Sequence, residues 1–435
     1  MCETTTNTTD GTGFTDRSGS RVGLGGIRHI RDGRSCDGDG PSDSGVGIHP
    51  ARSSGGARVV RLQRLPAKLQ LAARRDSLVS SESLLLGIDW KQPGGDAKHA
   101  VSLGASYNIV RSDYPSESSE SNFRHLFTGD VKMISGPVSF ESCSKFTIVD
   151  GSHMPVVFDG VGGTPAIGGV AVRDRRDQFA FSNKTALRYT HDKLFVRPVI
   201  TASVQDWGVD AVNTPGCSNY LDRSDLNAGV DLGYEAMKKT YLVVGYRYGQ
   251  QHQDNLFGLD INSSNNYHRV LFGIEGEPTS WLTLSVMGGP EFRNVGPNAP
   301  VGEEDTPTLG WIDATAKLKL GASDDLAFTV LQYTIPGSSG RYLDDEIQLG
   351  VLYTHRFSKT LSSTLGFRAW NGDFEGPVMR DDWIYTVSAG VDWKFAKNYS
   401  TGLAASYDWA QSDVPAVRGR EFDRFIVGAY LRVEF

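Results

Sequence analysis

The chain has 435 residues and a formal net charge of −7, and hydrophobic residues make up 39% of it. It holds no run of about 18 or more apolar residues, which excludes a membrane-spanning helix, and no basic stripe of the kind that binds nucleic acid. This composition does not exclude a barrel that crosses a membrane through strands, because every second residue of such a strand faces a polar interior.

The first 65 residues differ from the rest of the chain. They are rich in Gly, Ser, Asp and Arg and show no hydrophobic periodicity, which is typical of disordered segments. They also lack the charged stretch followed by an apolar stretch that makes up a secretory signal peptide. We therefore interpret residues 1–65 as disordered, or as a mis-assigned start of the chain, and predict a β-barrel over residues 66–435.

Beyond this segment, polar and apolar side chains alternate in one stretch after another. The clearest is WIYTVSAGVDWKF at 383–395, where the odd-numbered residues are mostly apolar and the even-numbered ones mostly polar. A period of two residues indicates a β-strand, since a helix would mix the two faces. In chain order we predict strands at 67–78, 82–91, 97–110, 123–134, 137–149, 178–190, 194–205, 224–234, 240–251, 266–276, 281–292, 311–320, 326–335, 345–356, 361–371, 383–395, 399–410 and 425–435.

Short and long connections alternate between these strands. Short ones such as 135–137 and 191–193 fall between long ones, of which 151–177 is the longest. An outer-membrane barrel sorts its connections in this way, with tight turns at one end and long loops at the other. The last strand ends on the turn side, which is periplasmic in such barrels. We therefore expect both termini in the periplasm and an all-β, antiparallel up-and-down barrel with eighteen strands, or sixteen as the alternative.

Aromatic residues stand near both ends of the last three predicted strands, with small and aliphatic residues between them. Such rings prefer the membrane–water interface, so two aromatic girdles around an apolar belt indicate a transmembrane barrel. A soluble β-sandwich would also alternate, but its strands usually hold only about 5–6 residues. A β-propeller would fit four strands into the about 40–45 residues that hold two here. The expected interface residues are Trp383, Tyr385, Trp393, Phe395, Tyr399, Tyr407, Trp409, Phe425 and Phe435.

The terminal strand alternates up to its last residue. It resembles the assembly signal that the barrel-insertion machinery of Gram-negative outer membranes recognises, through Val427, Ala429, Leu431, Val433 and Phe435. Tyr430 stands where the fuller signal often has glycine, and Val433 where an aromatic residue is common.

Longer segments resemble the outer-membrane family called Putative beta-barrel porin 2. They include GFRAWNGDFEGPVMRDDWIYTVSAGVDW at 366–393, SYDWAQSDVPAVRGREF at 406–422 and the segment 246–293. The resemblance covers roughly residues 82–435. It implies a barrel in the outer membrane of a Gram-negative-type cell, and it implies no catalytic residues.

Charged residues also occur on the strand faces opposite the apolar belt. Turned toward hydrocarbon, an unpaired charge would cost about 2–4 kcal/mol near the midplane, so these residues need water or partners. A barrel of about 16–18 strands is wide enough for an aqueous channel. Both signs are present, so no ion preference follows. The expected lumen-facing charges are Arg197, Arg247, Asp313, Lys317, Lys319, Arg368, Asp392, Lys394, Arg432 and Glu434.

The function that these features predict is passive diffusion of small hydrophilic solutes through the lumen. The loop 151–177 is our candidate for a constriction. The alternative is a non-conducting barrel with a plugged lumen and an adhesion or envelope-structural role. The expected partners are outer-membrane lipid, the insertion machinery and hydrophilic solutes, but no nucleic acid. A homo-oligomer is a further possible partner state, but nothing in the sequence marks an interface.

No motif predicts an enzyme. His268 has Ser263 and Ser264 close in sequence, but nucleophilic catalysis needs a base within hydrogen-bond reach, which neighbours in sequence do not establish. The acidic clusters lack the spacing of a calcium loop. The cysteines lack metal-ligand spacing and are expected to be unpaired thiols. We therefore expect no catalytic, cofactor or metal site.

Overall fold

The computed structural model describes residues 55–65, 75–92, 99–113, 115, 121–150, 177–208, 222–255, 260–336, 343–374, 380–413 and 422–433. Within these ranges every regular element is a β-strand. No helix in this part of the chain is long and apolar enough to cross a membrane.

The strands have the following bounds in chain order: β1 (Gly55–Leu65), β2 (Arg75–Lys91), β3 (His99–Asp113), β4 (Asn122–Ser135), β5 (Val138–Asp150), β6 (Asp177–His191), β7 (Leu194–Gly208), β8 (Arg223–Met237), β9 (Thr240–Gln253), β10 (Asn265–Thr279), β11 (Leu282–Val295), β12 (Thr308–Lys319), β13 (Asp324–Pro336), β14 (Leu343–Arg356), β15 (Leu361–Phe374), β16 (Arg380–Ala396), β17 (Tyr399–Ser412) and β18 (Phe422–Val433).

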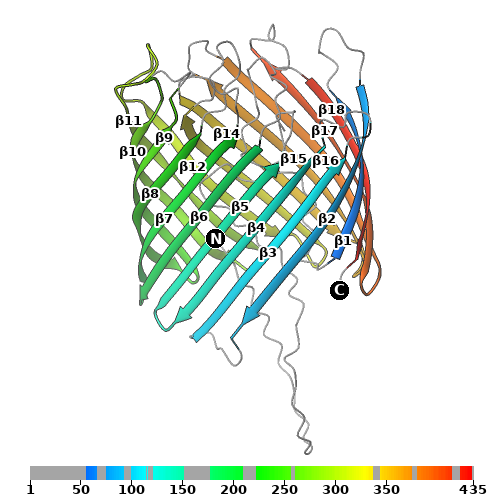
Figure 1. Ribbon diagram of the computed structural model, residues 1–435. Helices are drawn as coiled ribbons and strands as arrows, with labels where there is room; N and C mark the ends of the chain where they lie inside the picture. Colours follow the sequence, from blue (N-terminus) through cyan, green and yellow to red (C-terminus); the bar gives the residue numbers. More distant parts are fainter. Residues whose placement is uncertain are drawn as a thin grey trace, which may run out of the picture.

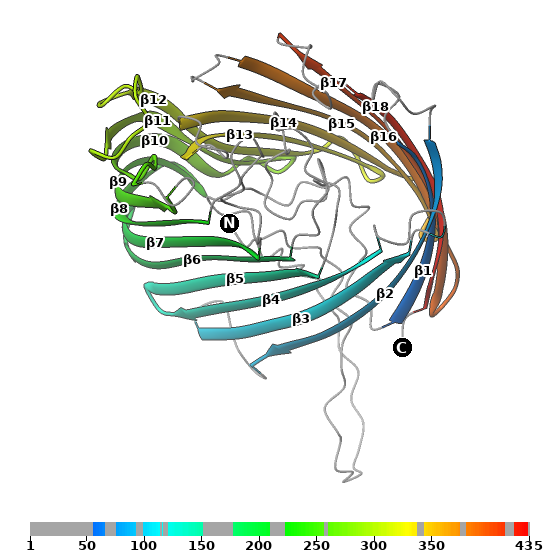
Figure 2. The same ribbon diagram turned by 45° about the horizontal axis from the view of Figure 1, so that its top comes forward.

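Each strand from β2 to β17 pairs antiparallel with the next one along the chain. β1 pairs with β2 on one side and with β18 on the other. The sheet curls into a barrel (Figure 1; Figure 2). The predicted all-β, up-and-down architecture is confirmed, and β2–β18 overlap the predicted ranges from 82–91 to 425–435.

The first strand differs from the prediction. β1 covers Gly55–Leu65 rather than 67–78, and β2 begins at Arg75. β1 therefore lies in the segment whose composition resembles disorder. The physical reason is that β2 and β18 each present a row of backbone N–H and C=O groups to a strand placed between them. Pairing on both sides outweighs the weak local pattern from which the range 67–78 was predicted.

The two-residue turns lie at one end of the barrel, which we call the turn end, and the long connection 296–307 lies at the other, the loop end (Figure 1). Two-residue turns at 136–137, 192–193 and 238–239 follow β4, β6 and β8. Their residues Gly136 and Asp192 adopt positive φ angles of 57° and 50°. Tight hairpin turns require such left-handed conformations, because these match the twist of the flanking strands.

The outer face of the barrel is apolar along the middle of the strands. On β16, Val387 and Val391 are exposed, whereas their neighbours Thr386 and Ser388 point inward and are buried. On β17, Leu403 is 62% exposed. A soluble protein rarely exposes so continuous an apolar surface. A hydrocarbon environment explains it.

Aromatic rings gather at both ends of this belt on β16 and β17. At the loop end, neighbouring ring centroids lie 5.2–5.8 Å apart along the series Trp383, Tyr385, Trp409 and Tyr407. At the turn end, the corresponding distances are 5.6 and 6.0 Å along the series Trp393, Phe395 and Tyr399. Phe425 is exposed beside Tyr407 in the register of β17 and β18. The two ends of these strands thus present aromatic side chains on the outer face.

A polar cluster interrupts the outer face on β5 and β6. The amide of Asn183 donates to the hydroxyls of Ser144 at 2.8 Å and Ser142 at 3.3 Å, and Ser142 lies 2.8 Å from the hydroxyl of Thr185. Exposed Ile148 and Leu187 share these faces. Burying a polar group without a hydrogen bond is costly. The four side chains avoid much of this cost by bonding to one another.

The substitutions Leu403→Arg and Ala404→Arg place the same charge on opposite faces of β17. Leu403 points outward, whereas Ala404 points inward and pairs with Gly390 and Gly428, which leave room. We expect Leu403→Arg to lose about 2–4 kcal/mol of unfolding free energy, since its charge faces hydrocarbon. Ala404→Arg should lose far less. Urea unfolding from lipid vesicles, followed by tryptophan fluorescence, measures both, and equal losses would contradict the assignment of the faces.

Candidate functional site: the barrel interior

The interior is filled on one side. The sheet curves tightly along β6–β13 (Figure 2). There, side chains of strands that are not neighbours in the sheet reach one another across the interior. Lys184 Nζ on β6 lies 3.9 Å from Asp313 Oδ2 on β12, and Gln251 Nε2 on β9 donates to the carbonyl of Thr334 on β13 at 3.0 Å. We call the inward side chains of β6–β13 the filled corner.

The half of the filled corner toward the turn end is a network of ion pairs. Asp231 accepts a hydrogen bond from Arg197 at 2.9 Å, and its Oδ1 atom forms an ion pair with Arg247 Nη1 at 2.8 Å. Glu275 accepts from Arg197 at 2.8 Å and from Arg188 at 3.1 Å. Asp231 is only 1% exposed, and Glu275 is also buried. A buried charge is tolerated when it is paired and hydrogen-bonded, and each acid here has two arginine partners.

The half toward the loop end repeats this arrangement. Glu291 accepts hydrogen bonds from Arg269 at 2.7 Å and from Arg293 at 2.6 Å. The ring of Tyr267 lies 4.9 and 5.2 Å from the two guanidinium carbons, close enough for cation–π attraction. Gly249 permits this position, since a Cβ atom there would lie 2.1 Å from the tyrosine ring. This half of the filled corner is therefore closely packed, and its charges are paired.

An apolar cluster adjoins the second network. It consists of the buried side chains of Leu271, Trp311, Tyr333 and Ile335. The guanidinium carbon of Arg269 lies 4.4 Å from the centre of the Trp311 ring, which joins the cluster to the ion pairs. Inward-facing residues of β10, β12 and β13 thus form a small core inside the barrel.

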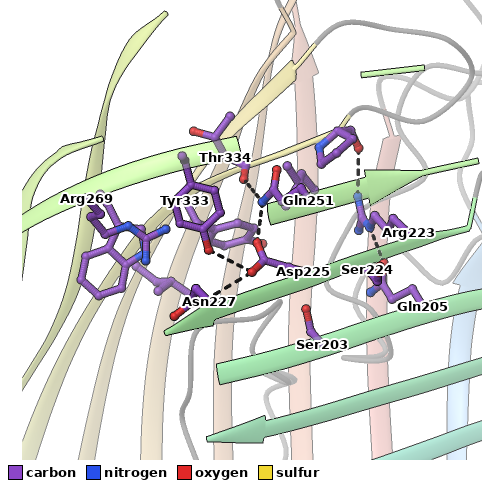
Figure 3. Close-up of a pocket in the computed structure, with 15 residues that line it drawn as sticks. Ser203, Gln205, Arg223, Ser224, Asp225, Asn227, Gln251, Arg269, Tyr333 and Thr334 are labelled. Carbon is purple, nitrogen blue, oxygen red and sulfur yellow. Dashed lines mark hydrogen bonds between the residues drawn. The ribbon is translucent and has the colours of Figure 1, made fainter. Parts of the chain in front are cut away.

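A pocket lies between the polar and the apolar parts of the corner (Figure 3). Its polar wall comes from β7–β9, and its apolar wall from β12 and β13. Asp225 accepts hydrogen bonds from Gln251 at 2.7 Å, from the Tyr267 hydroxyl at 2.9 Å and from the Asn227 amide at 3.3 Å. The residues named on the two walls are Ser203, Gln205, Asp225, Asn227, Gln251, Trp311, Leu331, Tyr333 and Ile335.

Arg223 lies at the loop end of the pocket. It donates to Gln205 Oε1 at 2.5 Å and to the carbonyl of Pro336 at 3.2 Å (Figure 3). These bonds connect β7, β8 and β13. In the described ranges no group of three or more His, Cys, Asp or Glu side chains is placed to hold a metal ion.

The structure divides the charges expected in the lumen into separate groups. Arg197 and Arg247 meet at Asp231 in the filled corner, and Asp313 meets Lys184 at its edge. Arg432 Nη1 lies 3.9 Å from Asp392 Oδ2 on the far side of the barrel. Four further residues of this set lie on the inward faces of β12, β15 and β16, namely Lys317, Lys319, Arg368 and Lys394. Glu434 lies outside the described ranges.

The residues of the expected assembly signal lie on β18. Val427, Ala429, Leu431 and Val433 share one face with exposed Phe425, whereas Phe435 is outside the described ranges. Tyr430 points inward and donates a hydrogen bond to Asp392. Its ring covers Gly402 on β17, where a Cβ atom would lie 2.5 Å from it. The tyrosine thus contributes to the interior of the barrel.

The structure bears on two further expectations, one for the cysteines and one for the loop 151–177. Cys143 is disulfide-bonded, so the expectation of unpaired thiols is wrong for this residue. Cysteine spacing in the sequence could not reveal the bond, because pairing depends on proximity in the fold. The candidate constriction 151–177 lies outside the described residues, apart from Asp177 at the start of β6.

Sequence reasoning missed most members of the filled corner. Arg269, Glu291 and Arg293 lie on strands whose alternation is weak, and their partners come from other strands. The available signal was whether a charged residue has an odd or an even number on the predicted strands 266–276 and 281–292, since alternate residues of a strand point to opposite faces. It could identify inward residues, but it could not identify the pairs they form.

Comparison with known proteins supports this architecture. The family described as Putative beta-barrel porin 2 matches residues 314–435, which confirms the resemblance drawn from the sequence. Of the segments that carried this resemblance, 366–393 and 406–422 lie inside the match and 246–293 lies outside it. No curated protein matches the chain. The match covers the C-terminal part of the chain, and this part is similar to outer-membrane β-barrels of the porin type.

Solved structures of outer-membrane barrels show weak similarity to the chain. OccAB4 of Acinetobacter baumannii has 11% identity and a TM-score of 0.40, over 88% of this chain and 97% of that one. The outer membrane protein OpdK of Pseudomonas aeruginosa has 11% identity and a TM-score of 0.41, over 88% and 98%. The siderophore receptor PirA of Pseudomonas aeruginosa has 10% identity and a TM-score of 0.36, over 87% and 79%.

The substitution Glu291→Gln tests the energetics of the filled corner. It removes the charge between Arg269 and Arg293, whose side chains are almost wholly buried. Breaking such a buried arrangement leaves uncompensated charge, so we expect a loss of about 3–5 kcal/mol in unfolding free energy. Urea unfolding in detergent micelles, followed by tryptophan fluorescence, measures it.

Asp325→Asn is the matched control for this substitution. Asp325 pairs with Arg356, but both side chains are largely exposed. An exposed ion pair contributes about 0–1 kcal/mol, so the control should change little. A Glu291→Gln protein as stable as the control would show that the ion pairs of the corner do not hold the strands together.

Proposed function

We propose that the protein is an outer-membrane channel through which small hydrophilic solutes diffuse passively. The channel is the lumen of a closed barrel of eighteen strands, with both termini on the periplasmic side. The pairing of β1 with both β2 and β18 supports closure and an even strand number. The grouping of the two-residue turns at one end supports the orientation, because short turns are periplasmic in such barrels.

The observation that carries the proposal is the exposure of inward residues beside the filled corner. Leu352 on β14 points inward, in register with Ala327 and Gly366, and is 44% exposed. Lys317 occupies the same row of the sheet and is also exposed. An inward leucine and lysine with this much accessible surface border open space rather than a packed core. In a membrane barrel that space is filled with water.

The charged residues of this lumen would set its ion preference, since rings of charge in a pore favour ions of opposite sign. The inward faces of β15, β16 and β18, outside the filled corner, carry Arg368, Asp392, Lys394 and Arg432. Both signs occur there, which suits neutral solutes and gives no strong preference for either ion. The tight pairing of Arg197 and Arg247 with acids removes most of their charge from this role.

The second candidate is a non-conducting barrel with an adhesion or envelope-structural role. The filled corner favours it, because ion pairs and aromatic rings already occupy part of the interior. The two functions share the same contacts with outer-membrane lipid through the apolar belt. They also share the proposed recognition of β18 by the insertion machinery.

Liposome swelling separates the two candidates. Liposomes that contain the purified full chain should swell in isotonic solutions of small sugars, at a rate that falls as the sugar becomes larger. This dependence on size reflects a water-filled pore. Absence of swelling in liposomes that hold correctly folded barrel, judged by its heat-modifiable migration on gels, would favour the non-conducting barrel.

Two cysteine substitutions test whether the lumen is accessible. Leu352→Cys places a thiol on the inner face and Leu365→Cys places one on the outer face, where Leu365 is 55% exposed. We expect a membrane-impermeant methanethiosulfonate carrying a sulfonate to react with the first and to lower its current in planar bilayers. The lipid-facing thiol should stay unmodified. Currents of the parent protein treated in the same way correct for its native cysteines, and reaction at neither position would count against an open lumen.

A further inference from the structure

The outer face of β5 and β6 carries polar side chains in the middle of the apolar belt. We call them the polar patch; they are Ser142, Ser144, Asn183 and Thr185. On β6 the patch lies between the exposed rings of Phe179 and Tyr189, which stand toward the two ends of the strand. The outward residues in the middle of β16, across the barrel, are instead Val387, Ala389 and Val391. Polar side chains at this depth in a membrane are costly and indicate a functional site.

The hydrogen bonds inside the polar patch leave one donor and one acceptor unused. The Asn183 amide nitrogen donates to the carbonyl of Cys143 at 3.1 Å, which fixes the orientation of the amide, since a carbonyl only accepts. Its Oδ1 atom accepts from the Thr185 hydroxyl at 3.0 Å and keeps a second lone pair. The Ser144 hydroxyl accepts from the amide at 2.8 Å, and its own proton has no acceptor among the described residues. Ser144 and Asn183 are both partly exposed, so the unused groups face the surroundings of the barrel.

Lipid chains offer no partner to these two groups, but a second copy of the chain offers both. Copies inserted in the same orientation hold the patch at the same depth, so a twofold axis along the membrane normal brings two patches together. Across such an axis, Ser144 of each copy would donate to Asn183 Oδ1 of the other. A symmetric dimer requires a self-complementary surface of this kind. Hydrogen bonds between Ser, Thr and Asn side chains also join membrane-spanning helices, for the same reason.

The surface beside the polar patch leaves room for a partner. Gly129 on β4 stands between Ala105 on β3 and Ser144 on β5 in the register of the sheet, so small residues adjoin the patch. A Cβ atom at Gly129 would have nothing within 4 Å, so the packing of the barrel itself does not require glycine there. Glycine inside a strand weakens the strand and often marks a place where another backbone approaches closely. An approaching copy of the chain accounts for this glycine.

A row of aromatic rings borders these small residues on the loop-end side. The ring centroids of Tyr107 and Phe127 lie 4.4 Å apart, and those of Phe146 and Phe181 lie 4.6 Å apart. The four residues stand side by side in the register of β3–β6. The rings and the small residues thus give the outer face a ridge next to a groove. Aromatic residues are enriched at protein interfaces, and a ridge beside a groove allows two surfaces to interlock.

We propose that the outer face of β4–β6 is a self-association surface, at which a second copy of the chain docks within the membrane to form a symmetric dimer. The polar patches of the two copies bond to each other, and Gly129 lets the two sheets approach. The inference goes beyond the proposed function, since each barrel keeps its own lumen. It rests on the apolar belt facing lipid.

The test uses the full chain in lipid vesicles, with one population labelled on surface amines by a donor fluorophore and another by an acceptor. We expect energy transfer that saturates as the protein-to-lipid ratio rises, and the half-maximal ratio gives the dissociation constant. Asn183→Leu should raise this constant about tenfold, which corresponds to about 1.4 kcal/mol. Ser144→Ala nearly preserves shape and should raise it several-fold.

Gly129→Leu tests the close approach, and Ala389→Leu is its matched control. The new side chain at Gly129 enters space that the barrel itself leaves empty and that the partner would fill, so association should weaken at least several-fold. Ala389 is exposed on the outer face of β16, away from the polar patch. Ala389→Leu should therefore associate like the parent. Heat-modifiable migration on gels verifies that each variant is folded.

The proposal is overturned if the parent shows no saturable energy transfer, or if Ser144→Ala and Gly129→Leu both associate like the parent. It is also overturned if Ala389→Leu weakens association as much as Gly129→Leu does. A dimer gives transfer that rises linearly with the fraction of acceptor-labelled chains, and a curved dependence would contradict the symmetric dimer. Sugar-driven swelling without saturable transfer would overturn this inference alone. Saturable transfer without swelling would count against the proposed channel and leave the interface in place.

Discussion

The structure depends on one constraint: a strand surrounded by hydrocarbon must find every backbone hydrogen-bond partner inside the sheet. Lipid offers no donors or acceptors, so only a closed sheet is stable there. The antiparallel pairing of consecutive strands meets this requirement from β2 to β18, and β1 meets it by pairing with both β2 and β18. The same constraint explains why a segment with the composition of a disordered chain, Gly55–Leu65, pairs as a strand.

Closure places the two faces of each strand in different surroundings, and the two faces obey different rules. The outer face is nearly uniform, because hydrocarbon accepts only apolar side chains along the belt and aromatic rings near its ends. Where polar side chains occur there, as in the cluster around Asn183, they bond to one another. The inner face is heterogeneous. Near the tightly curved strands it is packed with paired charges, and near Leu352 it borders open space.

The filled corner shows how such an interior can be ordered without a large apolar core. Each buried acid, Asp231, Glu275 or Glu291, lies between two arginines from different strands. Ion pairs of this kind are directional, so they define which strands approach one another across the interior.

The sequence by itself determined the strands β2–β18 and the direction in which most of their side chains point, because a period of two residues is a local property of the backbone. It placed Leu403 outside and Asp392 inside without any knowledge of neighbours. Only the tertiary structure decided the remainder. The pairing of β1 required the edges of β2 and β18. The meeting of Glu291 with Arg269 and Arg293, and of Lys184 with Asp313, depends on the register and curvature of the closed sheet, which no local pattern encodes. The pocket beside Asn227 exists because two walls far apart in the chain face each other across that curve.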